Sequence, residues 1–131
     1  TIISSCNMTC NGKNLFYNEL GDHWQAGCSF IINDAFELFY AFESFAENET
    51  YGNIQLDNIL VEAGQEVVAG EVIGYLLRHR PSAHIHYMLQ RNFEPVCPYQ
   101  YLSNESKTIF DALWAQIGWG TDPCNSTTFV L

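Results

Sequence analysis

Residues 61–74 constrain the fold more than any other part of the chain. This stretch reads VEAGQEVVAGEVIG, so Gly64 and Gly70 bracket the apolar residues Val67 and Val68. Glycine supplies backbone angles that other residues resist, which is what a tight turn requires. The pattern therefore predicts a short β-hairpin with glycine at its turns, followed by a further strand over residues 72–77.

A strand with two histidines follows this hairpin after a connection over residues 78–83. Residues 84–89 read HIHYML. Successive side chains of a strand point to opposite faces of the sheet. We therefore expect His84 and His86 to share one face, with the apolar residues next to them on the other face.

Two more strands are predicted upstream. Residues 28–32 and 36–45 are rich in aromatic and apolar residues, which is typical of strands, and residues 33–35 form a plausible hairpin turn between them. Residues 1–28 are polar and loop-like, and we expect a strand or turn there that is held by disulfide bonds. Residues 47–53 are expected to form an exposed loop.

A C-terminal helix is predicted over residues 104–117. Ser103 or Asn104 can cap its start, and Gly118 can end it. Apolar side chains recur at helical spacing along one face, namely Ile109, Phe110, Leu113, Trp114 and Ile117.

Together these elements predict a single, mainly β domain over residues 1–131. Residues 1–28 would form a disulfide-held N-terminal segment, residues 29–102 an antiparallel β core, and residues 103–131 a helix and tail. A length of 131 residues is that of about one domain.

The charge balance excludes some classes of partner. The chain has 15 Asp and Glu residues against 5 Lys and Arg residues, a formal net charge of −10. Such a field repels nucleic acids and anionic membrane surfaces. No apolar run approaches the roughly 20 residues needed to span a bilayer. We therefore expect neither nucleic-acid binding nor membrane insertion.

Sequons and cysteines favour an extracellular or cell-surface location. Four Asn-x-Ser/Thr sequons are candidate glycosylation sites, at Asn7, Asn48, Asn104 and Asn125. The chain begins at Thr1, which we interpret as the start of a mature product whose signal segment was removed or not included.

The five cysteines predict disulfide bonds in an oxidising compartment. They contain no C-x-x-C pair of the kind found in zinc knuckles or thioredoxin-like proteins. We expect a bond from Cys97 to Cys124 and a bond from Cys28 to either Cys6 or Cys10. The remaining cysteine would be a buried thiol or a link to another chain.

His84 and His86 are candidate zinc ligands. Catalytic zinc usually has three protein ligands and a water molecule, with neutral imidazole among the preferred ligands. Two histidines at this spacing can offer one ligand and one general base, or two ligands. They can equally be a half-exposed polar pair on a strand. His23 and His79 are the only other histidines.

Several segments resemble the C-terminal half of the lysostaphin-type zinc endopeptidases, which cut peptidoglycan cross-bridges. The resemblance rests on residues 59–74, on the strand AHIHYML at residues 83–89 and on the PVCPYQYL segment at residues 95–102. It implies a barrel-sandwich-like β core. It also implies that His86 is a zinc ligand and His84 a catalytic histidine.

The chain departs from that family at three places. The family's second catalytic histidine would fall on Phe42, and a phenyl ring cannot transfer a proton. The H-x-x-x-D motif that supplies two further zinc ligands is absent; the nearest candidate, at His23, lacks the Asp. The loop over residues 75–82 also replaces a glycine-rich loop. The resemblance therefore implies an incomplete zinc site.

Lipoyl and biotinyl carrier domains have a similar glycine hairpin. They present a modified lysine at a hairpin tip. The two lysines of this chain, Lys13 and Lys107, lie in no such hairpin, so a carrier function is not expected.

From these features we expect a secreted, glycosylated, non-catalytic peptidase-like domain that serves binding or extracellular assembly. Its partner would be a protein, a cell-surface glycan or copies of itself, and no cofactor would be needed. The alternative is an active zinc endopeptidase that cleaves peptidoglycan-type peptides. It would need ligands from unexpected positions such as His23, His79 or Asp34, or from another chain.

Overall fold

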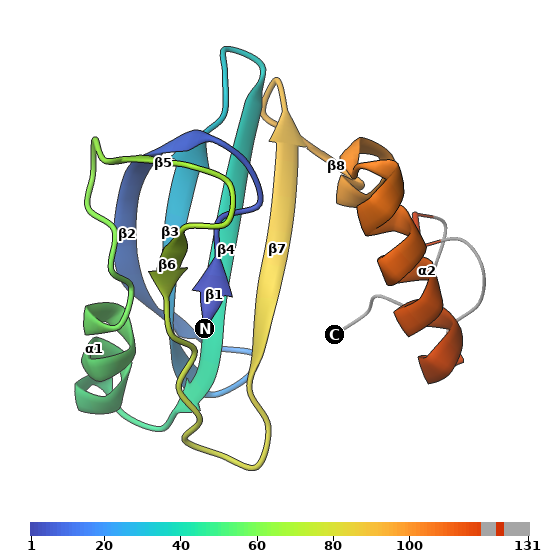
Figure 1. Cartoon of the computed structure of the whole chain (residues 1–131). Coiled ribbons are helices and arrows are strands. Elements are labelled where there is room, and N and C mark those ends of the chain that lie inside the picture. Colours follow the sequence, from blue (N-terminus) through green and yellow to red (C-terminus); the bar gives the residue numbers. More distant parts are fainter. Residues whose placement is uncertain (119–122, 125–131) are drawn as a thin grey trace. The chain divides into compact units, whose positions relative to one another are not determined.

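The computed structural model describes residues 1–118 and 123–124. They fall into two compact units, which divide between Pro95 and Val96. Strands account for 42% of the described residues and helices for 22%, so the predicted mainly β class is confirmed (Figure 1).

A six-stranded antiparallel sheet dominates the first unit. Its strand order is β5-β2-β3-β4-β7-β8. The bounds are Met8–Asn18 for β2, His23–Ile31 for β3, Phe36–Ala46 for β4, Glu66–Val67 for β5, His84–Arg91 for β7 and Glu94–Val96 for β8.

One face of this sheet carries the core. In Figure 1 the small sheet of β1 (Ile2–Ile3) and β6 (Val72–Gly74) lies in front of the large sheet, beside helix α1 (Glu49–Asp57). Side chains from the large sheet and from the segments over it are fully buried, among them Phe30, Leu38, Phe42, Ile59, Val61, Val67 and Ile73. Burying these apolar surfaces is the main source of stability for such a unit.

The other face of the sheet presents polar side chains of β4 and β7. Phe42 pairs with Ile85 and points into the core, so the neighbouring pair of Glu43 and His84 points to the opposite face. Ala41 pairs with His86 on that same opposite face. The alternation predicted for residues 84–89 is therefore present.

The N-terminal segment differs from the prediction. The strand expected within residues 1–28 is present as β2, whose eleven residues pair with β3 from Thr9 to Asn18. No disulfide bond holds it, because Cys6, Cys10 and Cys28 are free thiols. Polar residues of β2 alternate with buried ones such as Met8 and Cys10. That alternation is the pattern of a strand with one buried face.

The loop predicted at residues 47–53 is wrong, since helix α1 begins at Glu49. Asn48 caps it, and its side-chain oxygen accepts a hydrogen bond from the Tyr51 amide at 3.0 Å. Gly52 packs so closely on Leu15 and Trp24 that a Cβ there would lie 2.8 and 2.9 Å from their side chains. Glycine at this position reflects helix packing, although from sequence it indicates a loop.

The glycine stretch forms turns but no hairpin of its own. Gly64 and Gly70 have φ angles of +86° and +85°, as expected for glycine turns. However, β5 pairs with β2, and β6 pairs with β1. The strand predicted at residues 72–77 ends at Gly74. Partners distant in the sequence therefore replace the local pairing that the pattern predicts.

The second unit contains helix α2 (Asn104–Ile117) and a short 3-10 helix, Pro98–Tyr101. The side chain of Ser103 caps α2, and Gly118 ends it in the left-handed conformation, so the predicted bounds and caps are confirmed. None of the described helices is long and apolar enough to cross a membrane.

The cysteine predictions are half confirmed. Cys97 and Cys124 form a disulfide bond with a Cα–Cα distance of 5.5 Å. Cys6, Cys10 and Cys28 are free thiols, so the bond predicted for Cys28 is not formed. Cys28 lies opposite Lys13 and not opposite Cys10; diagonal neighbours on adjacent strands are about 7–8 Å apart, too far for a disulfide bond.

Three of the four sequon asparagines lie among the described residues. Asn7 and Asn48 each accept a backbone hydrogen bond through Oδ1, from Ala69 and Tyr51 respectively. Asn104 is the first residue of α2 and is exposed. Asn125 lies outside the described residues.

Candidate metal centre

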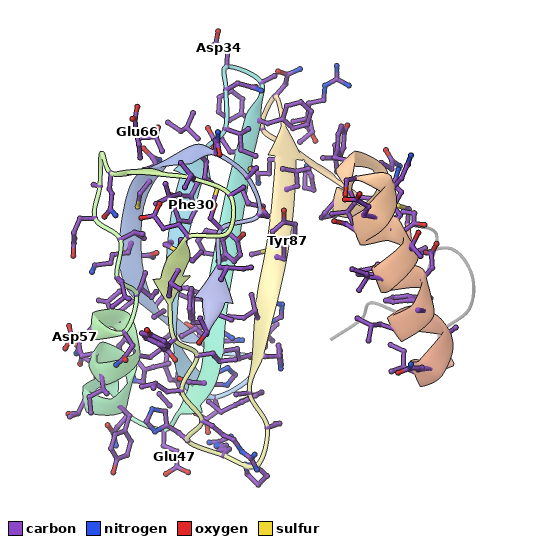
Figure 2. All side chains as sticks on the ribbon, in the orientation of Figure 1. Phe30, Asp34, Glu47, Asp57, Glu66 and Tyr87 are labelled. Atoms are coloured by element: carbon purple, nitrogen blue, oxygen red, sulfur yellow. A yellow bond between two sulfur atoms is a disulfide. The ribbon has the colours of Figure 1, made fainter. Side chains whose placement is uncertain are left out.

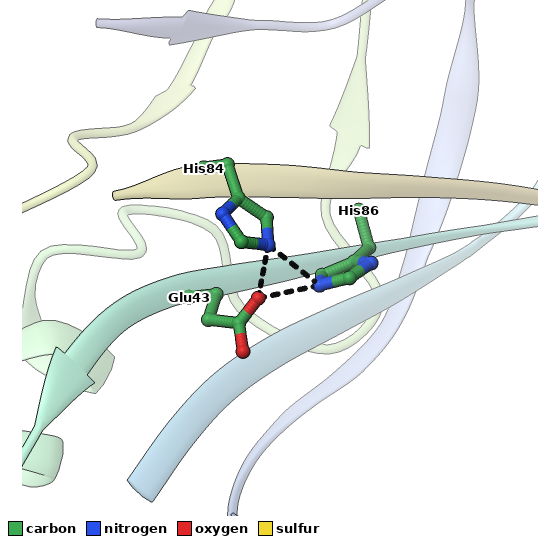
Figure 3. A group of neighbouring side chains, drawn as sticks. All are labelled: Glu43, His84 and His86. Atoms are coloured by element: carbon green, nitrogen blue, oxygen red, sulfur yellow. Dashed lines mark hydrogen bonds and ion pairs between the residues drawn. The ribbon is translucent and has the colours of Figure 1, made fainter. Parts of the chain in front are cut away.

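Glu43, His84 and His86 point toward one another on the face of the sheet that lies opposite the core (Figure 3). The Nε2 atom of His86 lies 2.6 Å from Oε2 of Glu43 and 3.1 Å from Nε2 of His84. His84 Nε2 also contacts Glu43 Oε2. Within the described residues this is the one group of three or more His, Cys, Asp or Glu side chains close enough to share an ion.

The pairing of two strands brings these side chains together. Glu43 on β4 lies directly opposite His84 on β7, and His86 lies two residues farther along β7 on the same face. Directly opposite Cβ atoms in an antiparallel pair are about 5 Å apart. The sheet therefore places all three side chains within reach of one point.

A bulge in β4 shapes the site further. Between the pairs Trp24–Ala46 and Ala26–Phe42, β3 has one residue and β4 has three. Phe45 lies in the bulge with a φ of +55°, an unusual angle for an aromatic residue. Its ring lies 4.7 Å from that of His23 and 5.5 Å from that of His84, so the bulge places an apolar wedge between two imidazoles.

The second oxygen of Glu43 is held from within the sheet. His23 Nε2 and Gln25 Nε2 both lie 2.6 Å from Oε1 of Glu43 and donate to it. His23 Nδ1 in turn lies 2.8 Å from the carbonyl oxygen of Gly21. Oε1 is therefore fully engaged, and Oε2 is left to face His84 and His86.

These contacts keep the carboxylate ionised. Burial would raise the pKa of Glu43, but the hydrogen bond from His86, the nearby His84 and the hydrogen bond from His23 outweigh it. The pKa of Glu43 therefore lies below its ordinary value. An ionised carboxylate is the form that binds a cation.

The donor set fits a zinc ion. Two imidazole nitrogens and one carboxylate oxygen form a recurrent set of ligands for catalytic zinc. The side chains of His84 and His86 are 42% and 34% exposed, whereas that of Glu43 is only 7% exposed. A bound ion would therefore have protein ligands on its inner side and an open position toward solvent.

Only part of this cluster could be identified from sequence. His84 and His86 lie together as predicted. Glu43 was missed, because fifteen acidic residues offer no basis for choosing one. The missing signal is strand register: aligning the two predicted strands antiparallel places Glu43 opposite His84.

The other residues considered as ligands lie outside the cluster. His23 is 1% exposed and contacts Glu43 from behind. His79 stacks on Tyr51 at 4.9 Å. Asp34 lies in a turn at the opposite end of the sheet from Glu47 (Figure 2). Phe42 lies in the core, on the face of β4 opposite to Glu43.

A shallow hollow lies on the same side of β4 and β7 as the cluster. The pairs Phe39–Met88 and Glu37–Gln90 follow Ala41–His86 along the strands, and all four of their side chains line the hollow together with Ser29 and Leu38.

No family model matches the chain, and no curated protein matches it significantly. The function must therefore be argued from the cluster itself.

Proposed function

We propose that this protein binds a zinc ion through Glu43, His84 and His86 and is a metal-dependent hydrolase. The observation that carries this proposal is the convergence of Oε2 of Glu43 with the Nε2 atoms of both histidines. The resemblance to lysostaphin-type endopeptidases supports a peptide as substrate. In that family the set of ligands is different, so Glu43 would replace the missing upstream motif.

Each residue of the centre would have a different role. Glu43 supplies a negative charge, fixed in place by His23 and Gln25. His84 and His86 supply nitrogen ligands and leave the outer side open to a substrate. A zinc ion held there would polarise a substrate carbonyl and activate water.

Metal analysis tests this proposal. Protein purified without chelator should contain about one zinc per chain, as the three-ligand set predicts, and His86→Ala should lose it. The zinc-loaded protein should cleave some members of a pool of quenched fluorescent peptides, including glycine-rich and peptidoglycan-derived sequences. Absence of zinc from the wild-type protein, or zinc binding without any cleavage, would contradict the enzyme.

A non-catalytic binding or assembly domain is the second candidate, and Phe42 favours it. The position that corresponds to the family's second catalytic histidine is a fully buried phenylalanine. Within the described residues, no further His, Cys, Asp or Glu lies close enough to these three side chains to share an ion with them. The partner would be a protein, a cell-surface glycan or a second copy of the chain.

Sedimentation and binding assays distinguish this candidate from the enzyme. It predicts zinc-containing protein that cleaves no peptide but forms oligomers or binds immobilised glycans or proteins. A strictly monomeric protein at high concentration that binds none of these would count against it.

Either function would operate outside the cell. The disulfide bond between Cys97 and Cys124 supports an oxidising compartment. At Asn7 and Asn48 the backbone hydrogen bonds use Oδ1. The Nδ2 atom, to which a glycan attaches, takes no part in them. Mass spectrometry before and after enzymatic deglycosylation of protein secreted from eukaryotic cells should reveal glycans at these sequons. Unmodified asparagines in such protein would contradict glycosylation.

A further inference from the structure

We propose that His23 and Gln25 are positioning residues that make Glu43 a one-oxygen ligand, and that they thereby select the metal ion. The centre would accept ions that favour four ligands including nitrogen, such as zinc and cobalt(II). It would reject calcium, magnesium and manganese(II). This inference rests on the proposed function, because it assumes that the cluster binds a metal ion.

The two carboxylate oxygens of Glu43 are not equally free to bind an ion. A carboxylate can bind an ion through both oxygens only if both are free to face it. Here Oε1 accepts hydrogen bonds from His23 Nε2 and Gln25 Nε2, each at 2.6 Å. Oε2 is the atom that faces His84 and His86. Two-oxygen binding would break both of the hydrogen bonds to Oε1.

The Glu43 carboxylate is also held in a fixed orientation. His23, Gln25 and Glu43 are 1%, 5% and 5% exposed, so water cannot easily replace a broken hydrogen bond. The His23 ring is fixed at its other nitrogen by the Gly21 carbonyl, and its face packs on Phe45. A rotation of the Glu43 carboxylate would leave buried donors without acceptors.

The number and type of the available ligand atoms decide which ions fit the centre. Two nitrogens and one oxygen leave one open position in a tetrahedral site, which suits zinc. Calcium takes six to eight oxygen ligands, and magnesium requires near-octahedral oxygen coordination. A single available carboxylate oxygen cannot meet either demand, and manganese(II) likewise favours oxygen-rich sites.

Cobalt(II) is the probe for the test, because its visible absorption is intense in four-coordinate sites and weak in six-coordinate ones. The wild-type protein should give an intense visible spectrum with one equivalent of cobalt(II). Zinc should abolish it, and excess calcium or magnesium should leave it unchanged.

Two variants remove the hydrogen bonds to Oε1, namely His23→Leu and Gln25→Leu. Each should lower zinc affinity about 10- to 100-fold, the usual effect of losing a partner behind a metal ligand. The absorption per bound cobalt(II) should fall, because the freed Oε1 raises the coordination number. Manganese(II) should compete better against zinc in both variants than in the wild-type protein.

Gln55→Leu is the matched control. Gln55 is also a fully buried glutamine, and its side chain bonds to the Tyr75 carbonyl oxygen and the Leu77 amide, not to the centre. This variant should lose stability but keep the wild-type cobalt(II) spectrum. If His23→Leu fails to fold by far-ultraviolet circular dichroism, Gln25→Leu decides the matter.

The possible failures are distinguishable. A wild-type protein that binds neither zinc nor cobalt(II) overturns the proposed function, and the inference with it. Wild-type binding with unchanged spectra and metal preference in the folded variants overturns the inference alone. A change of spectrum in Gln55→Leu equal to that in Gln25→Leu also overturns it, since the effect would then be a general consequence of destabilisation.

Discussion

At the scale of single residues, Glu43 gives its two carboxylate oxygens different partners. One oxygen is bonded to His23 and Gln25 within the sheet, and the other faces His84 and His86. A buried carboxylate without partners would be costly and would take up a proton. The partners on both sides are therefore what allows an ionised group to remain at this position.

The first prediction concerns the replacement of this carboxylate by an amide. Glu43→Gln should lower zinc affinity at least about tenfold, because a neutral amide is a much poorer ligand for the ion. Isothermal titration calorimetry with zinc measures the change. Glu47→Gln is the control, since Glu47 is exposed and pairs with Arg80 at 3.7 Å, not with the cluster. Equal affinities for the two variants would contradict a ligand role for Glu43.

The second prediction concerns the free thiols. Burial raises the pKa of Cys28 to about 12 and also raises that of Cys10. Because the thiolate is the reactive form, iodoacetamide at pH 8 should modify Cys6 well before either buried thiol. Peptide mapping after timed quenching shows the order. Modification of Cys28 as fast as Cys6 in folded protein would contradict it.

The same pKa shift predicts how stability depends on pH. The Cys28 thiol ionises in the unfolded chain near pH 9 but in the folded chain only near pH 12. The unfolded state therefore binds fewer protons above pH 9. The contribution of Cys28 to the free energy of unfolding is therefore constant below pH 9 and is lost as the pH rises toward 12.

At the scale of elements, the bulge of β4 distinguishes this strand from a regular one. It holds Phe45 at a φ of +55°, which only a few per cent of non-glycine residues adopt. Strained angles of this kind cost on the order of 1–3 kcal/mol and concentrate at functional sites. The ring contacts of Phe45 with His23 and His84 indicate what this strain achieves here.

The third prediction distinguishes the effect of backbone strain at Phe45 from the effect of its aromatic ring. Phe45→Ala and Phe45→Gly both remove the ring, but only glycine adopts this angle freely. The glycine variant should therefore unfold at a higher denaturant concentration than the alanine variant. Its free energy of unfolding should be larger by about 1 kcal/mol. Urea titrations of both variants measure this. An alanine variant that is the more stable would mean that the positive angle is not retained.

Sequence reasoning succeeded where signals are local. The cap at Ser103 and the left-handed Gly118 define helix α2, and residues 28–46 form the predicted hairpin. It failed for α1, whose glycine reflects close packing on Trp24, and for residues 66–74, whose strands pair with distant partners. Glu43 belongs to the second group, because a register between two strands gives it a role that its own sequence context lacks.

At the scale of the whole molecule, the two faces of the large sheet in the first unit have different contents. The apolar core lies beneath α1 and the small sheet, while the candidate metal ligands Glu43, His84 and His86 lie on the opposite face. The partly exposed side chains of His84 and His86 can therefore be replaced with little damage to the core. Ligand binding to the folded state alone adds stability in proportion to the logarithm of ligand concentration.

The fourth prediction follows from that linkage. Zinc at 100 times its dissociation constant should raise the free energy of unfolding by about 2.7 kcal/mol. A chelator should reverse the effect, and calcium should have none. Thermal melts followed by circular dichroism measure the shift, with the doubly substituted His84→Ala, His86→Ala protein as the control. Equal shifts in the control would place the ion elsewhere.

The bulge of β4 also determines which kind of genetic change would abolish the centre. Substitutions at the cluster remove one ligand at a time. Between the pairs Ala26–Phe42 and Trp24–Ala46, β4 has three residues and β3 has one. A deletion of two residues between Phe42 and Ala46 would make these two segments equal in length. Such a deletion would remove the local geometry that joins Glu43 to His23, with both histidines of β7 untouched. In this protein the length of a strand segment, as much as the identity of its residues, determines whether the centre exists.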